Sequence, residues 1–328
     1  MRPRIVIPAA ALALLLCASV FLPTRAAQQQ APPAQEPRTT IRAGVNLVNL
    51  FATVRDKNRR IIPDLTKEEF RIFEDGKEQK LEFFARELNL PLTLGLLVDT
   101  SPSQGAILGA EQDAATRFLQ RVMRQGDLTF VASFDSEVDL LSEFTEDLGR
   151  LERAVARTQV NAAGPRGMVQ GPFPTVPRGT RFYDAVYLGC LEKLVRETGR
   201  KALVVLTDGQ DQGSKVKLEE AVQAAQETNT VVHIILISDP AYYGGWYSGA
   251  GAVKKIAEET GGRVIEVRDD KKLEEAFDQI TEELRSQYAL GYYSLNAARD
   301  GKYRKIKVET ARKDSRILAR KGYYAPRN

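Results

Sequence analysis

Apolar residues from Leu92 onward follow two patterns that alternate along the chain. Near-continuous apolar runs, among them LTLGLLV, ALVVLT and VVHIILI, are typical of strands buried on both faces in the middle of a parallel sheet. Between these runs, apolar residues recur at helical spacing. We predict strands at 92–98, 128–134, 138–142, 202–207, 230–237 and 263–267, and helices near 106–124, 147–158, 181–197, 215–228, 250–260 and 270–286. This alternation predicts an α/β fold with a doubly wound, mostly parallel sheet and one short antiparallel strand at its edge.

Residues 41–90, which precede this region, have the period-two pattern of β-strands. The stretch FRIFEDGKEQKLEFF has two apolar-alternating arms around Asp75-Gly76, which is a strong signal for a tight hairpin. Just before it, Thr66 and Glu69 have the spacing of a capping box and predict one helical turn.

Residues 287–328 return to a β pattern, with a turn expected at Asp300-Gly301. Neither terminal segment has enough strands to close a core by itself. We therefore expect residues 41–90 and 287–328 to form one β-sandwich, with a domain at 91–286 inserted between them. The alternative is two small independent sheets that pack on the inserted domain.

The first 26 residues have the pattern of a secretory signal peptide: a basic start, an apolar run from Ile5 to Leu22, and a small residue at Ala26. Residues 27–40 are rich in Gln, Pro and Ala and are expected to be a disordered linker. We expect an exported protein, located in the periplasm, at the cell surface or in the medium. The alternative is an uncleaved membrane anchor, and membrane contact is expected only through that leader.

Charge and cysteine content exclude several classes of protein. Removing residues 1–26 takes away three arginines and no acids, so the formal net charge falls from +4 to about +1, which gives no support to nucleic-acid binding. The mature chain keeps a single cysteine, Cys190, which excludes an internal disulfide framework or a cysteine-based zinc cluster. Cys190 lies on an apolar helical face, where a packing role is expected.

Oxygen-bearing side chains follow three of the predicted elements. The stretch GLLVDTSPSQG places Asp99, Ser101 and Ser103 at the exit of a buried strand, Asp208 follows another buried strand, and Thr180 lies just ahead of a helix. Ligands of open α/β sheets bind beyond the carboxyl ends of the strands. Two carboxylates and three hydroxyls suit Mg²⁺, with Mn²⁺ and Ca²⁺ as alternatives, and leave room for a carboxylate from another molecule. Acids and serines at strand exits also cap helices, which is the simpler explanation of each residue taken alone.

This ordered set resembles the metal-ion-dependent adhesion site of von Willebrand factor type A domains, and the resemblance covers residues 92 to about 286. It implies that Ser101, Ser103 and Thr180 coordinate the ion through their hydroxyls. It also implies that Asp99 and Asp208 act largely through bound water, and that a partner's acid fills the sixth position. The family often has Gly where this chain has Pro102, which we expect to stiffen the loop and hold Ser101 extended. The flanking β segments resemble those of bacterial exported proteins related to this family.

Two loops are expected to border the same edge of the sheet. Residues 160–179 form a long Gly- and Pro-rich stretch, and residues 239–250 carry four large aromatic side chains among glycines. We expect these rings to form a rim that contacts a protein partner, and the alternative is that they fold back onto a neighbouring helix. The four are Tyr242, Tyr243, Trp246 and Tyr247.

Three further acids lie near the predicted site. Asp184 and Asp211 are candidates for orienting bound water. For Asp184 we favour a role in the first turn of a helix, and for Asp211 we favour a place in a solvated turn. Asp135 is expected to be only a turn residue.

The chain lacks the sequence signatures of common enzymes. The only histidine, His233, lies in the middle of a strand, where a packed core imidazole is expected. Neither the Gly-x-Ser-x-Gly elbow nor a Gly-rich phosphate or nucleotide motif occurs. We therefore predict a non-enzymatic, secreted, metal-dependent protein-binding module whose partner presents an Asp or Glu. The alternative is a structural component of an envelope assembly in which the metal site is stabilising or vestigial.

Overall fold

The computed structural model of the chain describes residues 47–87, 90–160, 179–237 and 249–327. Its central sheet has the order β10-β9-β8-β5-β6-β7, and its strands are β5 (Leu92–Asp99), β6 (Leu128–Phe134), β7 (Val138–Thr145), β8 (Arg200–Thr207), β9 (Thr230–Ile237) and β10 (Val264–Val267). Neighbouring strands are parallel except at the edge, where β7 runs antiparallel to β6. The predicted mostly parallel sheet is confirmed.

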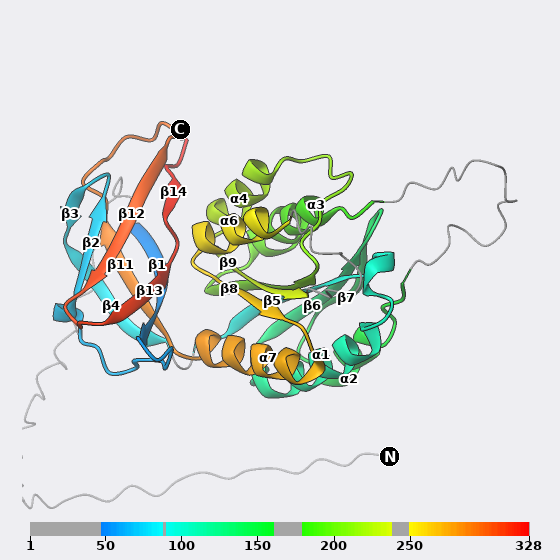
Figure 1. Cartoon of the computed structure of the whole chain (residues 1–328). Coiled ribbons are helices and arrows are strands. Elements are labelled where there is room, and N and C mark those ends of the chain that lie inside the picture. The colour runs from blue at the N-terminus through cyan, green and yellow to red at the C-terminus, as the bar shows by residue number, and fades with distance from the viewer. Residues whose placement is uncertain (1–46, 88–89, 161–178, 238–248, 328) are drawn as a thin grey trace, which may run out of the picture. The chain divides into compact units, whose positions relative to one another are not determined.

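Helices cover both faces of this sheet (Figure 1). One face is covered by α1 (Leu108–Val122), α2 (Leu148–Val155) and α7 (Asp270–Leu284), and the other by α3 (Phe182–Leu188), α4 (Leu218–Glu227) and α6 (Ala250–Thr260). Successive residues of a strand point to opposite faces, so Leu96 and Val98 of β5 pack under the first set of helices and Leu97 under the second. This explains why the strands are apolar at nearly every position. No helix in the described ranges is both long enough and apolar enough to cross a membrane.

The helix predicted at 181–197 is interrupted. After α3 the chain forms a π turn at Gly189–Lys193 and then a 3-10 turn at Leu194–Arg196. Val186, Cys190 and Leu194 all face the same core. Burial raises the pKa of the Cys190 thiol to about 12, which fits the expected packing role.

The terminal segments form two four-stranded antiparallel sheets in the described residues, with the orders β13-β1-β11-β4 and β14-β12-β2-β3. Their strands are β1 (Leu47–Asp56), β2 (Phe70–Glu74), β3 (Lys77–Gln79), β4 (Leu81–Glu87), β11 (Gln287–Tyr293), β12 (Tyr303–Thr310), β13 (Ser315–Ala319) and β14 (Gly322–Tyr324). Each sheet contains strands from both ends of the sequence, and the two share a core that includes Leu50, Ile72 and Tyr288. The segments therefore make one sandwich, and the alternative of two independent sheets is wrong.

The expected hairpin and helical turn are both present in the first terminal segment. Asp75 and Gly76 have φ angles of 47° and 79°, which suit a tight two-residue turn between β2 and β3. Thr66 and Glu69 close a capping box around the 3-10 turn at Lys67–Glu69. The second arm of the hairpin is shorter than predicted, because the chain leaves β3 after Gln79 and continues as β4 in the other sheet.

A buried carboxylate joins the two ends of the sequence inside the sandwich. Glu74, which is 2% exposed, accepts hydrogen bonds from the hydroxyls of Tyr292 at 2.8 Å, Ser294 at 2.6 Å and Tyr323 at 3.1 Å. Its donors come from the C-terminal segment, whereas Glu74 ends β2 in the N-terminal one. Hydrogen bonds to a charged group are stronger than neutral ones, so this cluster favours the pairing of the two segments.

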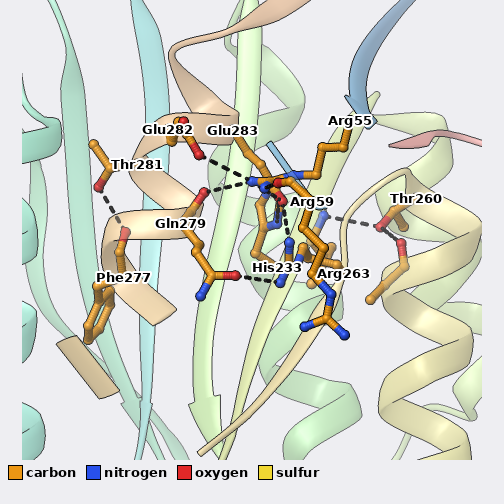
Figure 2. A network of polar contacts seen from close by, with 12 residues as sticks. Arg55, Arg59, His233, Thr260, Arg263, Phe277, Gln279, Thr281, Glu282 and Glu283 are labelled. Atoms are coloured by element: carbon orange, nitrogen blue, oxygen red, sulfur yellow. Dashed lines mark hydrogen bonds and ion pairs between the residues drawn. The ribbon is translucent and has the colours of Figure 1, made fainter. Parts of the chain in front are cut away.

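A second buried carboxylate links the sandwich to the α/β domain (Figure 2). Glu283, near the end of α7, lies 2.8 Å from Arg55 Nη2 of β1 and 2.8 Å from Arg263 Nη1, which precedes β10. The Nδ1 atom of His233 is 3.4 Å from the other oxygen of Glu283. Burial lowers the pKa of His233 despite the opposing effect of Glu283, so the ring is a neutral core imidazole, as the sequence predicts.

Replacing Glu283 with Gln is expected to lower the free energy of unfolding by about 3–5 kcal/mol, because it leaves a buried arginine without its carboxylate. The measurement is urea denaturation followed by circular dichroism. Glu282→Gln is the matched control: its carboxylate also faces Arg55, at 3.7 Å, but its side chain is 54% exposed, against 1% for Glu283. The free energy of unfolding of this control should fall by less than about 1 kcal/mol. Equal losses in the two variants would contradict a central role for Glu283.

Candidate functional site

The first strand of the α/β domain delivers a fully buried carboxylate to the carboxyl edge of the sheet. Asp99, the last residue of β5, is 0% exposed. Its Oδ1 accepts the backbone N–H of Ser101 at 2.9 Å, and its Oδ2 accepts the hydroxyl of Thr207 at 2.6 Å. Thr207 ends β8, which is paired with β5. The carboxylate of Asp99 is thus fixed from both neighbouring strands.

The proline in the loop after β5 has the expected effect on its neighbours. Ser101 has φ −62° and ψ 157°, which is extended, and Pro102 begins a 3-10 turn at Pro102–Gln104. This turn brings the hydroxyls of Ser101 and Ser103 within 2.9 Å of each other. Because the ring of Pro102 fixes its own φ and restricts Ser101, both hydroxyls are presented with little conformational freedom left to lose.

The second predicted carboxylate meets these hydroxyls. Asp208 directly follows β8, and its Oδ2 accepts the hydroxyl of Ser103 at 2.6 Å while its Oδ1 accepts the backbone N–H of Gln210 at 3.0 Å. In the sheet order, β6 lies on one side of β5 and β8 on the other. The site therefore lies where the strand order reverses, which is where open α/β sheets bind their ligands.

The loop that carries Thr180 lies against the loop that carries Asp208. Thr180 is 7% exposed and forms an antiparallel bridge with Gln212, whose N–H donates to the Thr180 carbonyl at 2.8 Å. At the preceding residue, Gly179, a Cβ atom would lie 2.2 Å from the carbonyl oxygen of Gln212. Only glycine allows the two backbones to approach this closely. Thr180 is thus joined to the Asp208 loop through the backbone.

The edge hairpin after β6 contacts two of the loops that carry predicted ligands. The hydroxyl of Thr100 donates to Asp135 Oδ2 at 3.3 Å, and the backbone carbonyl of Asp135 accepts the N–H of Arg181 at 2.7 Å. Asp135 also accepts the N–H of Glu137 within its own turn at 3.1 Å. The prediction that Asp135 is only a turn residue is wrong, because it also contacts the loops that carry Ser101 and Thr180.

The two remaining acids hold loops rather than a ligand. Asp184, in the first turn of α3 as predicted, accepts the backbone N–H groups of Lys215 at 2.9 Å and Val216 at 3.0 Å. Asp211 accepts the N–H of Tyr183 at 3.0 Å. Asp211 is half-buried and caps the start of α3, so the prediction that it lies in a solvated turn is wrong.

Burial, and then repulsion from neighbouring carboxyls, raises the pKa of two acids at this site. Desolvation, with a further contribution from Asp208, raises the pKa of Asp99 to about 7. Sequence reasoning missed a third acid, Glu111, on the buried face of α1. Burial and then the carboxyls of Asp99 and Asp208 raise the pKa of Glu111 well above its usual range. Its signal in the sequence is an acid at a position where the helical pattern requires an apolar residue.

The chemistry of these groups fits a hard divalent cation. In the described ranges no three His, Cys, Asp or Glu side chains converge as metal ligands, so any ion must rely on hydroxyls as well as carboxylates. The hydroxyls of Ser101 and Ser103 already contact each other and Asp208, which are contacts that an oxygen-seeking ion would replace. The four aromatic residues of the expected rim, Tyr242, Tyr243, Trp246 and Tyr247, lie outside the described residues.

Comparison with solved structures identifies the fold. A von Willebrand factor type A protein from Catenulispora acidiphila superimposes with a TM-score of 0.50 at 12% identity, over 79% of this chain and 73% of that one. BatB, a conserved hypothetical protein from Bacteroides thetaiotaomicron, matches with a TM-score of 0.46 at 16% identity, over 60% of this chain and 100% of that one. Proximal thread matrix protein 1 from the mussel byssus, with a zinc-occupied adhesion-site motif, matches with a TM-score of 0.49 at 14% identity, over 64% of this chain and 49% of that one.

The chain therefore has the von Willebrand factor type A fold, as its sequence motif indicates. No protein-family model and no curated protein matches the sequence.

The raised pKa of Asp99 predicts that the chelator-treated protein loses stability as the pH rises. The pKa of Asp99 in the folded state is about 7, whereas the usual pKa of an aspartate side chain is 3.8. Between those values the folded state binds more protons than the unfolded state, so the free energy of unfolding falls with rising pH, by about 2–4 kcal/mol from this group.

Urea denaturation at a series of pH values between 5 and 8 measures this effect. Asp99→Asn should have a weaker pH dependence than the wild type, and Asp139→Asn, an exposed acid on β7, should match the wild type. Identical slopes in the wild type and Asp99→Asn would show that Asp99 does not keep its proton in the fold.

Proposed function

We propose that the protein is an exported, Mg²⁺-dependent protein-binding module of the adhesion type. The observation that carries this proposal is the direct contact among the hydroxyls of Ser101 and Ser103 and the carboxylate of Asp208 at the switch point of the sheet. These groups come from separate loops, and the fold brings them together beside the buried Asp99. An all-oxygen set of this kind favours Mg²⁺, with Mn²⁺ and Ca²⁺ as alternatives.

The proposed coordination divides the residues into two groups. Ser101, Ser103 and Thr180 would bind the ion through their hydroxyls, and Asp99 and Asp208 would act through bound water. Neutral hydroxyls leave most of the positive charge of the ion uncompensated. The sixth position can therefore attract an Asp or Glu side chain of a protein partner.

A binding function is favoured over a catalytic one by the state of the only histidine. His233 is 2% exposed, is neutral, and contacts Glu283 in the polar network at the end of α7 (Figure 2). It therefore cannot reach a substrate as a general base. The second candidate function, a structural component of an envelope assembly with a stabilising metal, is supported by the mixed sandwich, whose strands from both ends give the chain further sheet edges.

The proposed organisation of the chain follows from the sequence. Residues 1–26 would direct export, 27–40 would form a linker, and the sandwich formed by 41–90 and 287–328 would present the α/β domain at 91–286. The aromatic residues of the loop at 239–250 would form the partner-binding rim. Export to the periplasm, the cell surface or the medium fits each of these parts.

Manganese titration followed by water-proton relaxation tests the proposal on the chelator-treated mature protein. The wild type should bind one Mn²⁺, and a short peptide containing aspartate should then reduce the relaxation enhancement, because its carboxylate displaces a bound water. Ser101→Ala/Ser103→Ala should bind no ion, since it removes two hydroxyl ligands. Ser315→Ala, which removes a hydroxyl that donates to the Arg312 carbonyl in the sandwich, should behave like the wild type.

The outcomes separate the two candidate functions. A wild type that binds no Mn²⁺ would overturn the metal site. A wild type that binds Mn²⁺ but does not respond to millimolar peptide would contradict recognition of a partner's acid and favour the structural role.

A further inference from the structure

Glu111 is a buried acid without a partner in the described residues. It is 1% exposed, and neither of its carboxylate oxygens has a hydrogen-bond partner there. Its neighbours on the same face of α1, Leu108 and Ala115, are part of the hydrophobic core. Leaving a buried polar group unpaired is unfavourable, and more so for a charged group, so an unpaired Glu111 lowers the stability of the fold.

Position and electrostatics direct Glu111 toward the candidate metal site. It lies in the first turn of α1, and side chains of a helix lean toward its N-terminus, which here follows the loop with Ser101 and Ser103. The carboxyls of Asp99 and Asp208 are close enough to act on it electrostatically. A carboxylate in the first turn is also favoured by the positive end of the helix dipole.

A second unpaired atom lies in the same stretch of chain. The side-chain oxygen of Gln104, which is 1% exposed, also lacks a hydrogen-bond partner in the described part of the molecule. Gln104 ends the 3-10 turn that starts at Pro102. Buried acceptors of this kind are normally satisfied by ordered water or an ion, and a hydrated cation beside the loop supplies hydrogen-bond donors.

We propose that Glu111 is a third carboxylate of the metal centre and acts on the ion through a water molecule bound to that ion. This inference rests on the proposed metal-binding function. Because no group of three acids in the described residues is arranged to hold a metal directly, we assign to Glu111 a contact with metal-bound water and not with the ion itself. In this position Glu111 accepts a hydrogen bond from a metal-bound water and holds that water in place. Glu111 is therefore a positioning residue that strengthens retention of the ion.

Four variants test this role by Mn²⁺ titration after chelator treatment. Glu111→Gln keeps the shape of the side chain and removes its charge, and it should weaken Mn²⁺ binding about 10- to 100-fold, which is typical of groups that orient metal ligands. Glu111→Asp keeps the charge and should restore part of the affinity. Asp113→Asn, an exposed acid two residues further along α1, and Ser315→Ala should match the wild type.

Thermal unfolding in chelator separates metal binding from folding. Glu111→Gln should be about as stable as the wild type without metal, because burial already favours the neutral form of Glu111 there, and it should gain less stability than the wild type when Mn²⁺ is added. Equal Mn²⁺ affinity in the wild type and Glu111→Gln would overturn the role of Glu111 and leave the metal site standing. If the wild type itself binds no Mn²⁺, the proposed function fails and this inference fails with it.

Discussion

The burial of two neighbouring carboxyl groups is the constraint on which the site depends. Asp99 ends β5, Asp208 directly follows β8, and they are 0% and 2% exposed; burial, and then the charge of Asp208, raises the pKa of Asp99. A fold that places like charges this close is stable in the charged form only when a cation or a set of fixed donors offsets them. The hydroxyls of Ser101, Ser103 and Thr207 supply part of this compensation. In the proposed function, a divalent cation would supply the rest.

The surrounding structure holds these groups in place. The hairpin at Asp135 contacts the loop of Ser101 through Thr100 and the loop of Thr180 through Arg181. A bridge between Thr180 and Gln212 then joins the second of these loops to that of Asp208. Each ligand-bearing loop is thus held by at least one contact outside the site. Little reorganisation is needed when an ion binds, which favours affinity.

The sequence allowed the fold, and the positions of Asp99 and Asp208 at strand ends, to be predicted because these depend on local patterns. Apolar runs buried on both faces define the central strands, and strand ends define where Asp99 and Asp208 lie. The errors share a different cause. Asp211 contacts Tyr183 and Asp135 contacts Thr100, both far away in the sequence, and no local pattern encodes those contacts.

Diffraction from crystals soaked in Mn²⁺, with anomalous scattering used to locate the ion, tests the central claim most directly. The account predicts one strong peak at the carboxyl edge of the sheet, about 2 Å from the hydroxyl oxygens of Ser101 and Ser103, with the contact between Ser103 and Asp208 replaced by metal ligation. The absence of a peak at this position, with the hydrogen bond from Ser103 to Asp208 intact, would contradict it.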